Sequence, residues 1–144
     1  MTIRTVLKSD REAIIAMMRM FYASPAVHTN GSEEIFQNDV EACISGSPYL
    51  EGYVFEENCT PVGYAMIAKS FSTEFGKPCI WIEDIYIKAE YRGKGMGSKF
   101  LAFISRKYQN AVIRLEVEAE NERAVHVYKK AGFQDLPYTE MLRF

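Results

Sequence analysis

The sequence has 144 residues, of which 48% are hydrophobic and 25% are charged, the profile of a soluble globular domain with one core. Its 17 Lys and Arg against 19 Asp and Glu give a formal net charge of −2. This balance argues against a broad nucleic-acid-binding surface, which needs a concentrated basic field.

Cysteine spacing and hydropathy narrow the class of protein further. The three cysteines, Cys43, Cys59 and Cys79, lie far apart without a CxxC pair, so neither a disulfide framework nor a zinc site is expected. No apolar run approaches membrane-spanning length, and the N-terminus lacks a signal-peptide core. These features predict one cytoplasmic domain over residues 1–144, with no membrane segment and no metal.

The first part of the chain predicts a short strand followed by two helices. Ile3–Leu7 favours the strand, and Ser9-Asp10-Arg11-Glu12 matches a capping box that would begin a helix. Apolar residues then recur at helical spacing from Ile14 to Tyr22. Ser32 is placed to cap a second helix that stops near Gly46.

The rest of the chain predicts strands that alternate with helices. The expected strands are Tyr49–Phe55, Val62–Ser70, Cys79–Ile87, Val112–Glu118 and one within Phe133–Phe144. The expected helices are Gly95–Tyr108 and Asn121–Ala131. This order predicts a mixed α/β (α+β) domain with helices flanking a central sheet.

A glycine-rich segment, Arg92-Gly93-Lys94-Gly95-Met96-Gly97-Ser98, joins a strand to a helix. Free N–H groups and the helix dipole at such a junction attract anions, and glycines let phosphate oxygens approach. Arg92 and Lys94 add charge. The spacing matches neither a Walker loop nor a dinucleotide fingerprint. The segment therefore indicates a phosphate site, with a glycine-rich turn carrying solvated cations as the alternative.

The same segment resembles the main signature of the GCN5-related N-acetyltransferase (GNAT) superfamily, Arg/Gln-x-x-Gly-x-Gly/Ala, at Arg92, Gly95 and Gly97. A second signature is matched by Asn121-Glu122-Arg123-Ala124, Tyr128 and Gly132-Phe133. The resemblance is clearest from Val62 to Phe133. It implies a V-shaped sheet in which Cys79–Ile87 and Val112–Glu118 splay apart to admit the pantetheine arm of acetyl-CoA.

The resemblance also implies which residues bind acetyl-CoA. The backbone of Ile85 to Ile87 would pair with the pantetheine amides as an added strand does. The amides of Gly93 to Ser98 would hold the pyrophosphate, and Asn121 and Ala124 would line the pantetheine. The implied set is Ile85, Tyr86, Ile87, Arg92, Gly93, Lys94, Gly95, Met96, Gly97, Ser98, Asn121 and Ala124.

The implied chemistry is direct attack of an amine on the acetyl thioester. Because an alkylamine has a pKa of about 10.4, roughly one molecule in a few thousand is neutral near pH 7, so a general base is useful. Glu83 is the first candidate, on the strand where the acetyl group would sit. Asp84 points to the opposite face unless a bulge re-aims it, and Glu116 is the next candidate. Tyr128 matches the family tyrosine that faces the CoA sulfur, and we expect it to donate a hydrogen bond to the thiolate.

The sequence says less about the amine that accepts the acetyl group than about the acetyl donor. Ile82-Glu83-Asp84-Ile85-Tyr86-Ile87 followed by Tyr91-Arg92-Gly93 resembles the spermidine/spermine (diamine) N-acetyltransferase branch. Paired carboxylates at Glu83 and Asp84 suit a polyamine or small primary amine. A peptide or protein amine ranks second, and a non-catalytic CoA-binding module or a nucleotide-phosphate binder stays open. Because a dimer is common in the resembled family, the analogy implies a homodimer to which Phe144 contributes. No metal role is expected for His28 or His126.

Overall fold

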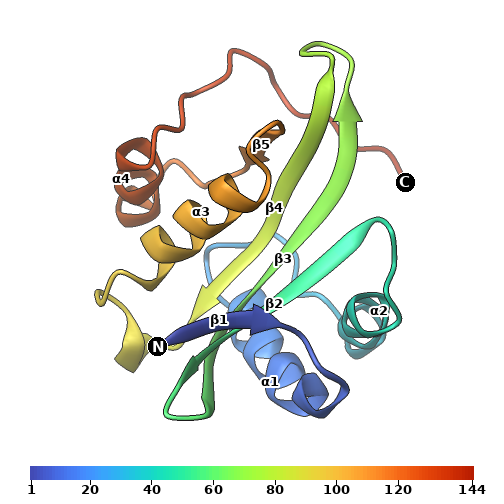
Figure 1. The fold of residues 1–144 in the computed structure, drawn as a ribbon, viewed down its shortest axis with the longest axis vertical. Coiled ribbons are helices and arrows are strands. Elements are labelled where there is room, and N and C mark those ends of the chain that lie inside the picture. Colours follow the sequence, from blue (N-terminus) through green and yellow to red (C-terminus); the bar gives the residue numbers. More distant parts are fainter.

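Five strands form one mixed sheet in the computed structural model, which describes residues 1–144 (Figure 1). They are β1 (Thr2–Thr5), β2 (Leu50–Glu57), β3 (Thr60–Ser72), β4 (Lys77–Ile87) and β5 (Val112–Leu115). The strands lie side by side in that order, antiparallel from β1 to β4, with β5 parallel to β4. The predicted fold class, a mixed sheet flanked by helices, is confirmed.

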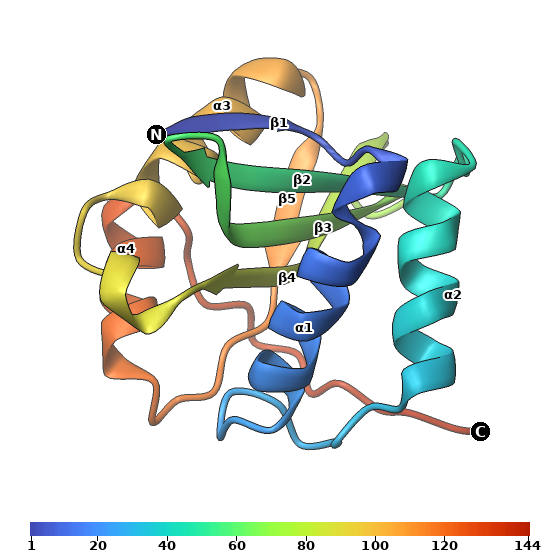
Figure 2. The ribbon, with the colours of Figure 1, turned by 90° about the horizontal axis from the view of Figure 1, so that it is seen from below.

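Two pairs of helices cover opposite faces of the sheet (Figure 2). The helices are α1 (Arg11–Tyr22), α2 (Glu33–Ile44), α3 (Met96–Lys107) and α4 (Glu122–Lys130). Apolar residues at helical spacing bury one stripe of α1 and α2 against one face and of α3 against the other. From α4, Val127 and Tyr128 pack partly against the α3 side. The sheet therefore separates two apolar cores.

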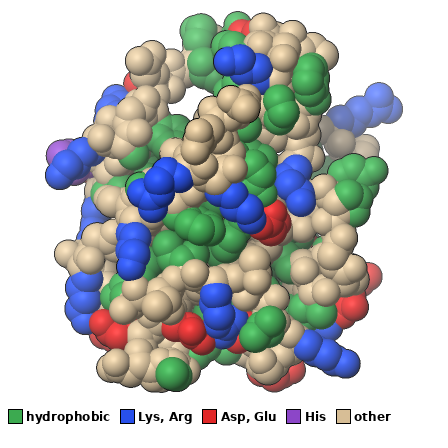
Figure 3. Space-filling view, in the orientation of Figure 1, with side chains coloured by type: hydrophobic (Ala, Val, Ile, Leu, Met, Phe, Trp, Pro, Cys, Tyr) green, Lys and Arg blue, Asp and Glu red, His purple; other side chains and the backbone are tan.

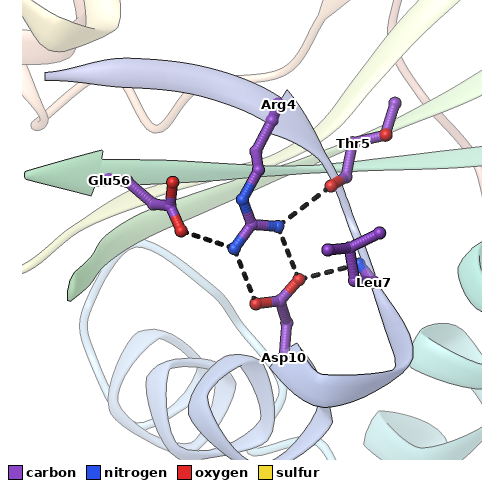
Figure 4. A network of polar contacts seen from close by, with 5 residues as sticks. All are labelled: Arg4, Thr5, Leu7, Asp10 and Glu56. Carbon is purple, nitrogen blue, oxygen red and sulfur yellow. Dashed lines mark hydrogen bonds and ion pairs between the residues drawn. The ribbon is translucent and has the colours of Figure 1, made fainter. Parts of the chain in front are cut away.

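Asp10, rather than the expected Ser9–Glu12 capping box, organises the start of α1. A 3-10 turn over Lys8–Asp10 precedes the helix, so α1 begins only at Arg11. Asp10 accepts two hydrogen bonds from Arg4, at 2.7 and 2.8 Å, and one from the Leu7 amide at 2.7 Å (Figure 4). Because Arg4 also donates to Glu56 on β2, this network ties the first strand and α1 to the sheet.

The cap predicted for the second helix is confirmed. Ser32 Oγ accepts a hydrogen bond from the Ile35 amide at 3.2 Å, and α2 begins at Glu33. This contact satisfies one of the free N–H groups of the helix start.

Strand β4 carries one extra residue, Glu83, opposite β3. Met66 pairs with Asp84 and Ile67 pairs with Ile82, so Glu83 has no partner. A bulge of this kind bends the strand and re-aims its side chains. Ile82 and Ile85 both join the core on the α3 side, whereas the Asp84 side chain is turned towards α1. The bulge thus breaks the regular alternation at the two acidic residues.

The C-terminal segment does not form the strand expected within Phe133–Phe144. It has no regular secondary structure and no strand pairing, and β5 ends at Leu115 instead of Glu118. With only four residues, β5 offers a short edge, and Pro137 has no N–H to donate to it. The segment instead passes the β3–β4 hairpin, where Tyr138 donates a hydrogen bond to Glu74 at 2.9 Å. Its Met141, Leu142 and Phe144 side chains are exposed.

Candidate active site

A groove of about 2100 Å³ opens where β4 and β5 separate. It is lined by the second half of β4, by β5 and the residues after it, by α4, and by the loop after α1. This volume exceeds the roughly 300–1,000 Å³ of common small-molecule pockets. The groove therefore has room for a long donor molecule together with an acceptor.

The two strands stop pairing at the bulge. Hydrogen-bonded register between β4 and β5 runs from Cys79 opposite Val112 to Ile82 opposite Leu115. Beyond Ile82, β4 keeps β3 on one edge and has no strand on the other. Backbone N–H and C=O groups on this open edge suit an extended ligand with amides of its own. The splayed strands of the predicted V-shaped sheet are confirmed.

One end of the groove meets the glycine-rich loop, which leaves several amides free. Gly93 and Gly95 adopt positive φ values of 80° and 79°, which favour glycine, and Gly95 precedes the first turn of α3. The first α3 amide with a backbone acceptor is that of Lys99, which bonds to the Gly95 carbonyl at 3.0 Å. The amides of the preceding turn remain available to an anion, as expected at a helix N-terminus.

The predicted donor-binding residues divide into two groups in the structure. Residues that line the groove are Ile85, Tyr86, Ile87, Arg92, Gly97, Asn121 and Ala124. The others adjoin it in the loop and the first turn of α3, namely Gly93, Lys94, Gly95, Met96 and Ser98. The Met96 side chain is buried in the core, so only its backbone is placed for a ligand.

Glu83 is exposed to the groove, and other carboxylates lie around it. Partial desolvation by the groove walls raises the pKa of the Glu83 carboxyl above its usual value, and the charges of Glu140 and Asp39 add to this shift. Hydrogen bonding with Glu140 raises the pKa of Glu116 to about 7, together with partial burial and the charges of Glu140 and Glu83. Glu83 of β4, Glu116 after β5 and Glu140 of the C-terminal segment thus bring carboxylates to one part of the groove, which favours a cationic ligand.

Asp84 lies deeper than Glu83. It is 6% exposed, and it accepts hydrogen bonds from Tyr64 at 2.9 Å and from Tyr22 at 3.4 Å. Burial raises its pKa to about 6, although these hydrogen bonds act in the opposite direction. Tyr22 is the last residue of α1. Asp84 therefore connects the bulged strand to the end of α1, next to the loop that borders the groove.

Helix α4 places Tyr128 and Asn121 on the wall opposite β4. Tyr128 is half-buried beside Phe133, with ring centroids 6.0 Å apart, and burial raises the pKa of its phenol. The Asn121 Oδ1 atom accepts a hydrogen bond from the Ala124 amide at 3.2 Å and so caps α4. Glu83 and Tyr128, the two predicted catalytic residues, therefore both line this groove.

Sequence reasoning considered the irregular segment that carries His28 as a cover for the acceptor site, but it gave no role to Glu140 or Arg123. The loop Ser24–Thr29 lines the groove, and His28 Nε2 lies 2.5 Å from Glu118 Oε1 beyond β5. Glu140 comes from the C-terminal segment and Arg123 from the start of α4. Most of these residues lie in irregular segments that carry no periodic pattern, so only the tertiary structure brings them together. Of Glu140 and Arg123, only Arg123 had a signal in the sequence, its place inside the second signature.

Comparison with known proteins identifies the family to which this groove belongs. The family model described as Acetyltransferase (GNAT) family matches residues 14–133. The chain belongs to the GNAT family. Solved structures show the same fold for this GNAT protein. A possible acetyltransferase from Clostridium difficile 630 superposes with a TM-score of 0.84 at 21% identity, covering 99% of this chain and 96% of that one. The acetyltransferase AAC(6')-Iy, in complex with a bisubstrate analogue, has a TM-score of 0.80 at 15% identity, covering 99% and 97%.

Curated relatives have a higher sequence identity to part of this GNAT chain than the two solved structures have. The thialysine N-epsilon-acetyltransferase of Bos taurus is 42% identical over 82 residues, and that of Mus musculus is 37% identical over 82 residues. These alignments cover 55% of this chain and 48% of either relative. The chain thus spans about half the length of the curated relatives it matches. The predicted likeness to the diamine acetyltransferase branch is confirmed by these relatives.

Other side chains of the GNAT protein define no metal site. No group of three or more His, Cys, Asp and Glu side chains is arranged to hold a metal ion. Cys43, Cys59 and Cys79 are all free thiols. None of the four helices is both long and apolar enough to cross a bilayer.

Proposed function

We propose that this chain transfers an acetyl group from acetyl-CoA to a primary amine. The observation that carries the proposal is the opening of the β4–β5 pair at the Glu83 bulge, next to the free amides at the start of α3. A donor with an amide-bearing arm and a diphosphate fits these two features in sequence. The residues present therefore suit acetyl-CoA as co-substrate, within a GNAT domain that we assign to residues 1–144.

The proposed reaction has one bond-forming and one bond-breaking event at the acetyl carbon. The neutral amine attacks the thioester carbonyl, a C–N bond forms, and the C–S bond breaks to release CoA thiolate. Glu83 accepts the proton from the attacking nitrogen, directly or through one water. A pKa raised above the usual carboxyl value makes Glu83 a stronger base near neutral pH.

Tyr128 is assigned as a hydrogen-bond donor to the departing sulfur. A thiol has a pKa of about 8.5 and a phenol about 10, so full proton transfer to the thiolate is uphill by roughly 2 kcal/mol. Burial raises the pKa of Tyr128 further and increases that difference. The proton that neutralises the thiolate then comes from solvent, while Tyr128 lowers the energy of the leaving group.

For the acceptor, we propose a small primary amine, with polyamines favoured. Support comes from the negative charge of Glu83, Glu116 and Glu140 around the acetyl position. A bound ammonium group would relieve the repulsion among these carboxylates. The curated relatives named for thialysine acetylation agree with a small amine. A peptide or protein amine is the second acceptor class.

Release of free thiol from acetyl-CoA across an amine panel tests this function. The panel contains polyamines, diamines, thialysine, lysine, aminoglycosides and lysine-containing peptides, and mass spectrometry identifies the acetylated product. We expect turnover with at least one small amine, and fastest with a polycationic one. Binding of CoA without turnover on any amine would favour a non-catalytic module. Turnover restricted to peptides would move the acceptor to the second class.

A further inference from the structure

Two basic residues in the glycine-rich loop are already engaged within the protein. Arg92 Nε donates a hydrogen bond to the Ile87 carbonyl at 2.7 Å, and its guanidinium lies 5.7 Å from the centre of the Tyr86 ring. Lys94 Nζ lies 4.9 Å from the centre of the Tyr91 ring and 4.0 Å from Glu57 Oε2. Lys94 does not line the groove. Arg92 is therefore already engaged by Ile87 and Tyr86, and Lys94 lies beside Tyr91 and Glu57, outside the groove lining.

A third cation, Arg123, reaches the loop from the opposite wall. It stands in the first turn of α4, which Asn121 caps, and its side chain is exposed and lines the groove. A Cβ atom built on Gly93 would lie only 3.3 Å from Arg123 Nη2. Arg123 takes part in none of the nine ion pairs and donates no side-chain hydrogen bond. Its guanidinium is thus an unpaired cation beside the free amides of the loop. Figure 3 shows how Lys and Arg side chains surround an apolar area on the visible face of the molecule.

We propose that Arg123 binds the diphosphate of the acyl-CoA donor and closes the phosphate site from the α4 side. The inference rests on the proposed function, since it takes acyl-CoA as the ligand. The guanidinium presents five donors in a planar fork that matches paired phosphate oxygens. Loop amides hold one side of the diphosphate, and Arg123 holds the other. Arg123 thus supplies the second cation that the sequence alone suggested at Lys94.

The conformation of Gly93 supports this arrangement. At φ 80° the backbone is in a region that side chains disfavour, and the missing Cβ leaves room for the Arg123 head to approach. Arg123 follows the Asn121 cap by two residues, so the cap also holds the Arg123 backbone in place at the start of α4. A ligand phosphate placed at the α3 amides therefore meets a guanidinium that is already at the loop.

Calorimetric binding of CoA and dephospho-CoA to wild type, Arg123→Gln and Arg106→Gln tests the proposal. Arg106 is an exposed cation of α3 outside the groove, so its substitution is a matched control for net charge. Charge-assisted hydrogen bonds of this kind predict a loss of about 10- to 100-fold in affinity for Arg123→Gln. Both ligands retain the diphosphate, so both should weaken equally, while Arg106→Gln should bind both as wild type does.

Kinetics separate this inference from the proposed function. Arg123→Gln should raise KM for acetyl-CoA and leave kcat at saturating acetyl-CoA near the wild-type value. A loss confined to CoA would place Arg123 at the 3′-phosphate and overturn the diphosphate assignment, as would unchanged binding of both ligands. If wild type binds CoA but acetylates no amine, the transfer proposal fails while the binding data still decide the role of Arg123. If wild type does not bind CoA, both proposals fail.

Discussion

Tyr64 donates a hydrogen bond from its hydroxyl to Asp84 Oδ2 over 2.9 Å, and so joins β3 to the bulged strand β4 beneath α1. Tyr64 is fully buried, and Asp84 is 6% exposed. Burial disfavours the charged form of the carboxyl and raises the pKa of Asp84 to about 6, from an ordinary value of 3.8. A buried carboxylate is thus held one residue from the proposed base.

The raised pKa of Asp84 predicts a pH-dependent cost to stability. Between about pH 4 and pH 6 the unfolded chain binds fewer protons at this residue than the folded chain, so the free energy of unfolding falls as pH rises. The loss approaches a value on the order of 3 kcal/mol. Asp84→Asn removes this titration. Urea unfolding at several pH values should therefore show wild type losing stability relative to Asp84→Asn over this window.

Asp135→Asn is the matched control for that comparison, because Asp135 is 84% exposed. Its stability difference from wild type should stay nearly constant over the same window. A constant difference between wild type and Asp84→Asn would show that Asp84 titrates normally in the folded protein.

Gly63 is predicted to tolerate no side chain. A Cβ atom there would lie 2.5 Å from the Tyr86 carbonyl oxygen and 2.8 Å from Phe55 Cδ2. Gly63→Ala should therefore destabilise the fold by about 1–3 kcal/mol through overpacking. Gly97→Ala is the control, since a Cβ there meets nothing within 4 Å, and alanine favours a helix by up to about 1 kcal/mol. Equal urea midpoints for the two variants would contradict the predicted close contact at Gly63.

Tyr128→Phe should lower kcat by about 10- to 100-fold, the loss expected for one hydrogen bond to a charged leaving group. The measurement is turnover at saturating acetyl-CoA and amine. Tyr49→Phe serves as the control, because Tyr49 is 74% exposed and does not line the groove. Unchanged turnover in Tyr128→Phe would exclude the role of this hydroxyl, and complete loss with intact donor binding would indicate obligatory proton transfer.

The regular elements were largely predictable because their signals are local. Helical spacing located α1 and α3, Ser32 located the start of α2, and the glycines located the loop before α3. The first helix start was misplaced because Asp10 bonds to Arg4 and Leu7, contacts that depend on the path of the chain around it.

The unpredicted features of the site depend on distant partners. The sequence left a bulge at the paired acidic residues as an alternative, but a bulge exists only relative to the register of β3, so the Ile82–Ile87 segment alone could not decide it. Glu140 reaches the carboxylates because the C-terminal segment fails to pair as a strand. Arg123 lies beside Gly93 although some thirty residues separate them in the chain. The spacing of a motif does not show which of its basic side chains faces the groove.

The most direct test of the central proposal is turnover of Glu83→Gln with saturating acetyl-CoA and the best amine of the panel, followed from about pH 6 to pH 9. Loss of a general base predicts a decrease in kcat of about 10²- to 10⁴-fold near pH 7. The deficit should shrink as rising pH supplies more neutral amine. Glu116→Gln, which removes the alternative base, should retain most of the activity. Wild-type turnover in Glu83→Gln near pH 7, or a large loss only in Glu116→Gln, would contradict the assignment of Glu83 as the base.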